Sequence, residues 1–285
     1  MKYSLLIGMI VLSSALAGAI YEYVQKTPTS EYAQHVTTDQ TEKEKAFPQS
    51  VSLDIGQGVY MEFVRINPGL FTMGSSLYSG EGDEAPEHKV TISAPFYLGK
   101  YEVTQEQWEV IMGNNPSSFI GDQLPVDHVS WNDAQLFMNK LQDQTGRTFV
   151  LPTEAQWEFA ARASTSTLWE FGDSEGALAE YAWFGENADA TTHPVGKKKP
   201  NAWGVYDMYG NVQEWCADWY ANPYSPGDIS DPQGPESGES RVARGGAWGD
   251  DFTMVRSSYR NAIGPDDSTP GTGFRVVMSM GANDQ

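Results

Sequence analysis

The sequence consists of short apolar segments separated at close intervals by Gly, Pro, Asn and Asp, with 28 Gly and 16 Pro among 285 residues. This pattern runs from about Val51 onward and contains few long helical periodicities. The 9 Trp, 14 Tyr and 12 Phe can form a sizeable core, because each aromatic side chain removes a large apolar area from water. Such a sequence predicts an α+β domain with much coil, held together by packing rather than by long regular elements.

Three segments carry the start signal of a helix. Each begins with a Thr or Ser that can act as N-cap, followed three positions later by a polar residue that can bond back to the cap. We predict helices that start at the caps Thr104, Ser130 and Thr153, the second of which ends at Gly146. Strands are predicted at residues 61–66, 88–92, 95–100 and 273–277.

The charge balance restricts the partners of the chain. There are 38 acidic and 18 basic residues, which gives a formal net charge of -20. A surface of this charge repels polyphosphate backbones and anionic headgroups. We therefore expect no nucleic-acid partner, and contact with a membrane only through an N-terminal anchor.

The N-terminus has the pattern of an export signal. Lys2 precedes an apolar stretch from Leu5 to Ala19 that is interrupted only by Gly and Ser. We expect residues 1–20 to be a signal peptide, or alternatively an uncleaved anchor. Residues 21–50, rich in Thr, Gln, Glu and Lys, are expected to be a flexible linker, and residues 51–285 one folded domain. Either alternative places the domain in the periplasm or outside the cell.

The most distinctive motifs lie in the C-terminal third. The run from Gly204 to Trp219 reads GVYDMYGNVQEWCADW, and it is followed by RGGAW at 244–248 and GFRVV at 273–277. With the blocks that precede them, these motifs resemble the formylglycine-generating enzyme, or sulfatase-modifying factor, family across residues 60–278. The earlier blocks are, in order, FTMGS at 71–75, EAPEHKV at 84–90, KYEVT at 100–104, PVDHVSW at 125–131, LPTEAQWEFAAR at 151–162 and PNAWG at 200–204.

This resemblance implies a single domain with the formylglycine-generating-enzyme fold, a C-type-lectin-like α+β fold rich in coil. Proteins similar to this family include siderophore-maturation proteins of the PvdO type, the sulfoxide synthases of ergothioneine biosynthesis and variable ligand-binding proteins. Because one fold hosts several activities, the function has to be argued from the site residues.

The resemblance also shows what this chain lacks. In the formylglycine-generating enzymes, two cysteines after the Gly-Gly step bind copper and activate oxygen, and a pair of soft thiolates suits monovalent copper. Here residues 247–256 contain no cysteine, and Ala247 and Gln213 also depart from the family's usual residues. The only cysteine, Cys216, is expected to be a small buried apolar residue. We therefore expect neither bound copper nor oxidation of a sulfatase cysteine.

A redox centre without thiolates would need other ligands, and the pocket candidates for it are Asp250, Asp251 and Arg256. A facial triad requires two histidines and a carboxylate on one face. The histidines show no such spacing, so we assign no catalytic residue and expect each of them to have a structural role. They are His35, His88, His128 and His193.

A calcium site is predicted in the loop from Asp207 to Glu214. These two carboxylates, with the backbone carbonyls of Gly210 and Val212, supply within eight residues the oxygen ligands that calcium prefers. The resemblance implies a structural calcium at the matching positions. The alternative is a capped turn in which both side chains bond to backbone amides without metal.

Four arginines stand out in the acidic chain. We expect them to pair with buried carboxylates such as Glu154, Glu158 or Asp218 and so to hold coil segments in place. The alternative is an anion- or peptide-binding cleft lined by aromatic residues. The arginines are Arg244, Arg256, Arg260 and Arg275, and the aromatic candidates are Trp248, Phe252 and Tyr259.

Three functions remain open. The first is an exported binding or maturation factor of the PvdO type, whose partner is a protein, a peptide or a secreted metabolite. The second is an oxidoreductase with a metal centre that uses no thiolates. The third is a variable lectin-like protein that binds ligand through residues 247–272.

Overall fold

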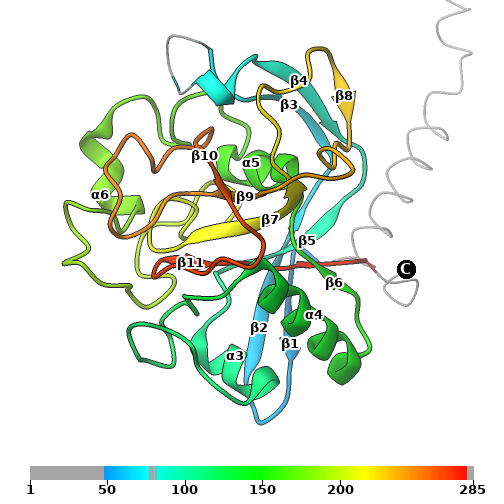
Figure 1. Cartoon of the computed structure of the whole chain (residues 1–285), viewed down its shortest axis with the longest axis vertical. Coiled ribbons are helices and arrows are strands. Elements are labelled where there is room, and N and C mark those ends of the chain that lie inside the picture. Colours follow the sequence, from blue (N-terminus) through cyan, green and yellow to red (C-terminus); the bar gives the residue numbers. More distant parts are fainter. Residues whose placement is uncertain (1–47, 77–79, 81, 281–285) are drawn as a thin grey trace, which may run out of the picture. The chain divides into compact units, whose positions relative to one another are not determined.

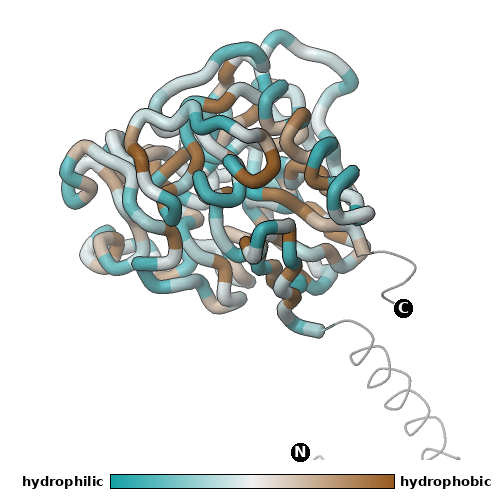
Figure 2. The backbone as a smooth tube through the Cα atoms, turned by 90° about the horizontal axis from the view of Figure 1, so that it is seen from below, coloured by the Kyte–Doolittle hydropathy of each residue, from teal (hydrophilic) through white to brown (hydrophobic). Residues whose placement is uncertain are grey.

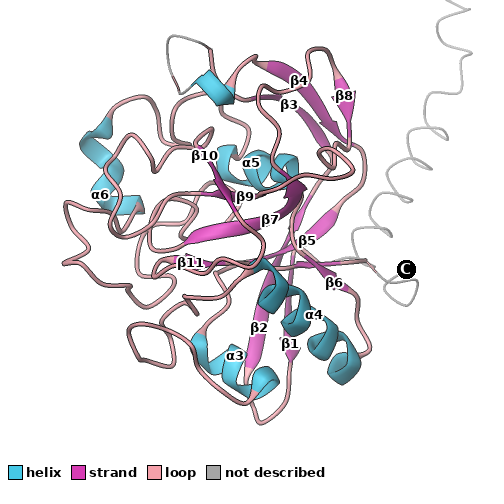
Figure 3. Ribbon diagram, viewed as in Figure 1, coloured by secondary structure: helices cyan, strands magenta, loops and turns pink. Residues whose placement is uncertain are grey.

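The computed structural model describes residues 48–76, 80 and 82–280 (Figure 1). The predicted signal peptide or anchor, and all but the last three residues of the predicted linker, lie outside the described residues. Within the described part, no helix has the length and apolar character needed to cross a bilayer. Loops connect most of the short elements, as the coil-rich pattern predicts (Figure 3).

The largest sheet has five strands in the order β1-β2-β5-β12-β6, and all its pairings are antiparallel. In β2 the side chains alternate, so that Met61 and Phe63 are buried while Tyr60 and Glu62 face solvent. This alternation fixes which face of the sheet covers the core. The strands are β1 (Ser50–Asp54), β2 (Tyr60–Ile66), β5 (Phe96–Gly99), β6 (Phe149–Val150) and β12 (Val277–Met278).

Two smaller sheets complete the fold. One has the order β10-β9-β7-β11 and the other the order β3-β4-β8, and in each the last strand is added in parallel. A register shift between Trp215 and Trp219 bends β7 where it pairs with β9. The strands are β3 (Gly69–Met73), β4 (His88–Ile92), β7 (Gln213–Trp219), β8 (Ile229–Ser230), β9 (Arg241–Arg244), β10 (Arg260–Ile263) and β11 (Thr272–Gly273).

The helix caps are confirmed. Thr104, Ser130 and Thr153 each accept a hydrogen bond from the backbone N–H three residues on, and each forms a complete capping box. Gly146 ends the second helix in the left-handed conformation that a glycine adopts at low cost. The helices are α3 (Gln105–Met112), α4 (Trp131–Thr145), α5 (Glu154–Arg162) and α6 (Leu178–Tyr181), with short 3-10 turns at η1 (Gly82–Glu84) and η2 (Glu175–Ala177).

One predicted strand is wrong in its extent. Residues 273–277 do not form one strand, because β11 ends at Gly273 in the four-stranded sheet and β12 begins at Val277 in the five-stranded sheet. Between them, Arg275 turns fully inward to an ion pair with Glu214. The chain therefore passes from one sheet to the other at this arginine.

Two clusters of buried apolar side chains form the core. One surrounds α5 and includes Trp157 and Trp169, and the other lies under α3 and α4, where the rings of Trp108 and Phe137 stack 5.4 Å apart. Along the described part of the backbone, apolar residues are interspersed with polar ones (Figure 2). Helix α4 presents one apolar face to the interior, formed by Ala134, Phe137, Met138 and Leu141.

Candidate functional site

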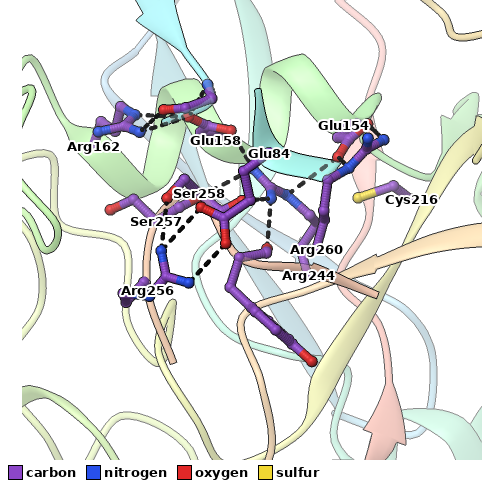
Figure 4. Close-up of polar contacts among 12 residues, drawn as sticks. Glu84, Glu154, Glu158, Arg162, Cys216, Arg244, Arg256, Ser257, Ser258 and Arg260 are labelled. Atoms are coloured by element: carbon purple, nitrogen blue, oxygen red, sulfur yellow. Dashed lines mark hydrogen bonds and ion pairs between the residues drawn. The ribbon is translucent and has the colours of Figure 1, made fainter. Parts of the chain in front are cut away.

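Arg244, Arg256, Arg260 and Arg275 are buried and paired with carboxylates, as the first of the two sequence-based alternatives predicts. Figure 4 shows the first three of them. Arg244 donates to Glu158, and its Nε lies 3.7 Å from Glu154. Arg260 makes two hydrogen bonds to Glu154, of 2.8 and 2.7 Å. Asp218 does not pair with either arginine and accepts a hydrogen bond of 2.7 Å from the backbone N–H of Glu154.

Arg256 is also part of a buried ion pair that links distant segments of the chain. Its two terminal nitrogens donate to the two carboxylate oxygens of Glu84 at 2.9 and 2.7 Å, in a bidentate pair with both partners buried. These bonds connect the segment that precedes β10 to η1, which lies more than 170 positions earlier in the sequence. Of the three pocket candidates, only Asp250 therefore lines the cavity beside the Gly-Gly step, although the charge of Arg256 still lowers the pKa of Asp251.

One of the predicted calcium residues, Glu214, belongs to a further buried ion pair, with Arg275. Glu214 accepts hydrogen bonds from Arg275 at Oε1 and Oε2, each of 2.6 Å, and from the indole of Trp157 at 2.8 Å. Asp207 accepts at Oδ2 from the N–H of Gly196 at 2.7 Å, while its Oδ1 is buried without a hydrogen-bond partner among the described residues.

A third carboxylate, Glu102, adds negative charge to this region. It accepts from Val212 N–H and from Asn211 Nδ2, at 3.0 and 2.7 Å. Burial, and then the charges of Asp207 and Glu214, raise the pKa of Glu102 well above its ordinary value. Burial likewise raises the pKa of Asp207 to about 6. Three buried carboxylates here share one guanidinium, that of Arg275.

These observations test whether the residues suit calcium. No three His, Cys, Asp or Glu side chains converge on a metal position in the described residues, but the predicted site uses only two side chains and takes its other ligands from carbonyls. The excess of negative charge and the unpartnered Oδ1 of Asp207 favour a cation. Glu214 is less open to a metal, because Arg275 and Trp157 already occupy both of its oxygens. Of the predicted side-chain ligand atoms, only Oδ1 of Asp207 has no hydrogen-bond partner among the described residues and is thus open to a cation.

A cavity of about 400 Å³ opens beside the Gly-Gly step. Asp250, Trp248 and Tyr259 are among its lining residues, whereas Asp251, Phe252 and Arg256 are not. All of the lining except Gln213 comes from residues 247–272. The residues are Gln213, Ala247, Trp248, Gly249, Asp250, Met254, Tyr259, Asn261, Thr269 and Pro270.

Two side chains give this cavity its chemistry. Asp250 accepts at Oδ2 from the N–H of Ala247 at 2.9 Å, and burial raises its pKa. It forms no ion pair with any described residue. The indole ring of Trp248 packs edge-on against Phe119 at 5.7 Å, and its Nε1–H is buried without an acceptor among the described residues. The cavity is thus lined by a carboxylate without an ion-pair partner among the described residues and by the indole ring of Trp248, whose Nε1–H is itself buried.

The remaining candidates lie elsewhere. Asp251 is exposed, and hydrogen bonds from Thr253 lower its pKa. Cys216 is fully buried, as predicted, and burial raises its pKa well above the ordinary value, so a thiolate is disfavoured. Trp183 stacks on His193 at 3.7 Å, while the Nδ1 of His88 hydrogen-bonds to the carbonyl of Pro86. His35 lies outside the described residues.

The sequence reasoning missed several members of these sites. Glu102, Asn211 and Trp157 were not singled out, although all three fall within quoted motif blocks. Glu84 was also missed, and its position in the EAPEHKV block was the only signal that could have pointed to it.

Comparison with known proteins identifies the family. The model of the family described as "Sulfatase-modifying factor enzyme 1-like domain" matches residues 54–280. The chain belongs to this family. Its fold is the α+β, C-type-lectin-like fold that the motifs imply, because two solved structures that share this fold match it closely.

The similar proteins differ in their described roles. Treponema denticola variable protein 1 is 31% identical, with a TM-score of 0.76, and the match covers 82% of this chain and all of that one. PvdO from Pseudomonas aeruginosa is 30% identical, with a TM-score of 0.71, over 81% of this chain and 98% of that one. The "Chaperone protein LppX" of Paenibacillus barcinonensis is 29% identical over 76% of this chain and 89% of its own length.

Proposed function

We propose that this sulfatase-modifying-factor-like protein is an exported binding or maturation factor and does not oxidise cysteine to formylglycine. The observation that carries the proposal is the chemistry of the cavity at Asp250. Its lining contains no sulfur ligand other than the thioether of Met254, and the single thiol of the chain, Cys216, is buried in the core. Monovalent copper therefore lacks the thiolate pair that suits it.

The same cavity has the features of a peptide-binding surface. Asp250 attracts a basic group, and the ring of Trp248 supplies apolar contact area. Three exposed apolar residues accompany this cavity. Met254 and Phe252 belong to the segment that lines it, and Ile120, 74% exposed, directly follows the Phe119 that contacts Trp248. A net charge of -20 favours a cationic partner.

The relatives are consistent with this proposal in different ways. The relative named a chaperone supports action on a partner molecule, whereas the variable protein supports the alternative of a diversified ligand-binding surface. That alternative is favoured by one observation, the origin of nearly all the cavity lining from residues 247–272. Both functions need the cavity to bind, so one experiment tests their shared basis.

The test is binding of the purified protein to an array of immobilised peptides of systematically varied sequence. We expect selection of peptides in which a basic residue lies beside an apolar one. Trp248→Ala should weaken this binding about tenfold or more, since a central aromatic contact carries much of the energy. Asp250→Asn should remove the preference for the basic residue. Tyr60→Ala, an exposed aromatic residue on β2, is the matched control and should bind like the unmodified protein. Equal binding by all three variants would contradict the proposal.

We also propose that Asp207, Gly210, Val212 and Glu214 hold a structural calcium ion. The cation would balance the carboxylates that Arg275 alone does not neutralise, and it would fix a loop with little secondary structure of its own. Gly210 suits this turn, because its φ is +73° and a Cβ there would meet the carbonyl oxygen of Trp183 at 2.0 Å. The expected effect of calcium on stability is treated in the Discussion.

The location follows from the N-terminal sequence. We propose that the domain functions in the periplasm or outside the cell after removal of the first twenty or so residues. N-terminal sequencing of the protein isolated from its cells tests this, and an intact Met1 would instead indicate the uncleaved anchor.

A further inference from the structure

A second cavity, of about 210 Å³, lies away from the Asp250 cavity and shares no lining residue with it. It is bounded by the N-terminus of α5, the end of β7, the start of β4 and the segment after β8. Its lining residues are Met73, His88, Glu154, Ala155, Asp218, Trp219, Ala221, Tyr224, Ser225, Ile229, Pro232, Gln233, Gly234, Pro235 and Arg260.

Three buried charged groups lie in the wall of this cavity: Glu154, Asp218 and Arg260. Glu154 and Arg260 neutralise each other through their two hydrogen bonds. Asp218 forms no ion pair with any described residue, and its only hydrogen bond to another residue's donor in the described chain comes from Glu154 N–H. The charged lining therefore has an excess of one negative charge, located at Asp218.

The other polar groups leave little capacity to bind an anion. The Nη1 group of Arg260 donates to the carbonyls of Asp83 and Ala221, at 3.1 and 2.7 Å. The hydroxyl of Tyr224 donates to Glu154 at 2.8 Å. His88 uses Nδ1 as a donor to the Pro86 carbonyl, since that oxygen can only accept. The donors of Arg260, Tyr224 and His88 Nδ1 are thus already engaged with protein acceptors.

We propose that this cavity binds a small organic cation, an ammonium group on a short apolar chain, with the ammonium at Asp218. The buried carboxylate supplies a charge-assisted hydrogen bond, and Met73, Ile229 and Pro235 supply apolar contacts for the chain. The volume suits a group about the size of a lysine side chain. This site is separate from the proposed peptide cavity, so either can fail without the other.

Binding should depend on pH. Burial, and then the nearby charge of Glu154, raise the pKa of Asp218 to about 7, while Arg260 acts in the opposite direction. The other titratable groups around it are His88 on β4, Tyr224, Arg241 on β9 and Cys216 on β7. Because only the ionised carboxylate attracts an ammonium ion, affinity should rise as the pH is raised through about 7 and then level off.

The test is titration of the isotope-labelled protein with n-butylammonium, followed by the NMR shifts of Trp219 and Ile229. Butyrate and 1-butanol serve as anionic and neutral probes of the same length. We expect n-butylammonium to bind most tightly, with Asp218→Asn weakening it about tenfold or more. This substitution keeps the shape and the acceptor for Glu154 N–H, and the NMR spectrum itself reports whether the variant is folded.

Glu236→Gln is the matched control, because Glu236 is an exposed acid next to the lining residue Pro235. It removes the same charge without touching the cavity and should leave binding within about twofold. Equal binding of butyrate and n-butylammonium, unchanged binding by Asp218→Asn, or no shift at Trp219 and Ile229 would each overturn the proposal.

Discussion

Glu158→Gln is expected to lower the free energy of unfolding by about 3 to 5 kcal/mol, the range found when one partner of a buried ion pair is removed. Glu158 is fully buried and serves three groups. Its Oε1 accepts from the N–H of Gly74 at 2.9 Å and from Arg162 at 2.8 Å, and its Oε2 accepts from Arg244. The substitution keeps the side-chain shape but leaves two buried guanidinium groups without this charge (Figure 4).

Urea denaturation measures this effect against a matched surface pair. Glu62 and Lys100 form a hydrogen-bonded ion pair of 2.9 Å, with 47% of the Glu62 side chain exposed. Glu62→Gln should cost less than about 1 kcal/mol, because solvent screens exposed pairs. If both substitutions cost the same small amount, the arginine and glutamate network would not be what holds the coil segments together.

Removal of calcium is expected to have the second large effect. If free calcium is present at about 100 times its dissociation constant, chelation should lower the free energy of unfolding by about 3 kcal/mol. Asp207→Ala removes the unpartnered Oδ1 and should abolish this response to calcium. Asp251→Ala, at an exposed aspartate, should keep it.

Thermal unfolding with and without calcium, together with equilibrium dialysis, tests the site without any assay of activity. Dialysis should give about one calcium per chain for the unmodified protein and none for Asp207→Ala. Equal unfolding temperatures with calcium and with chelator would show that the loop is a metal-free turn, the alternative left open by the sequence.

The local signals of the sequence were sufficient for the parts of the fold that depend on nearby residues. The caps at Thr104, Ser130 and Thr153 depend on contacts three residues away, so the helix starts were predicted correctly. The strand at 273–277 was predicted wrongly because its break depends on Arg275 and on Glu214, 61 positions earlier. Periodicity along a short segment contains no information about such a distant partner.

The site residues show the same difference between signals from nearby residues and contacts with distant ones. Trp248 was found because it belongs to the motif RGGAW, and Asp250 because it lies two residues after that motif; the structure places both in one cavity. Arg256 belongs to the same segment, but its ion-pair partner, Glu84, lies 172 positions earlier in the sequence. Because of this buried pair, Arg256 holds two distant segments together and does not line the cavity. The Asp218 cavity joins segments from Met73 to Arg260, and only the folded chain brings them together.

The central claim is that this family member binds its partner without oxidising it. The most direct measurement is mass spectrometry of a cysteine-containing sulfatase peptide incubated with the purified protein, copper, a thiol reductant and oxygen. The account predicts that the cysteine stays intact and that oxygen uptake does not exceed that of a blank without protein. Conversion of the cysteine to the formylglycine aldehyde, at a rate that scales with protein concentration, would contradict it.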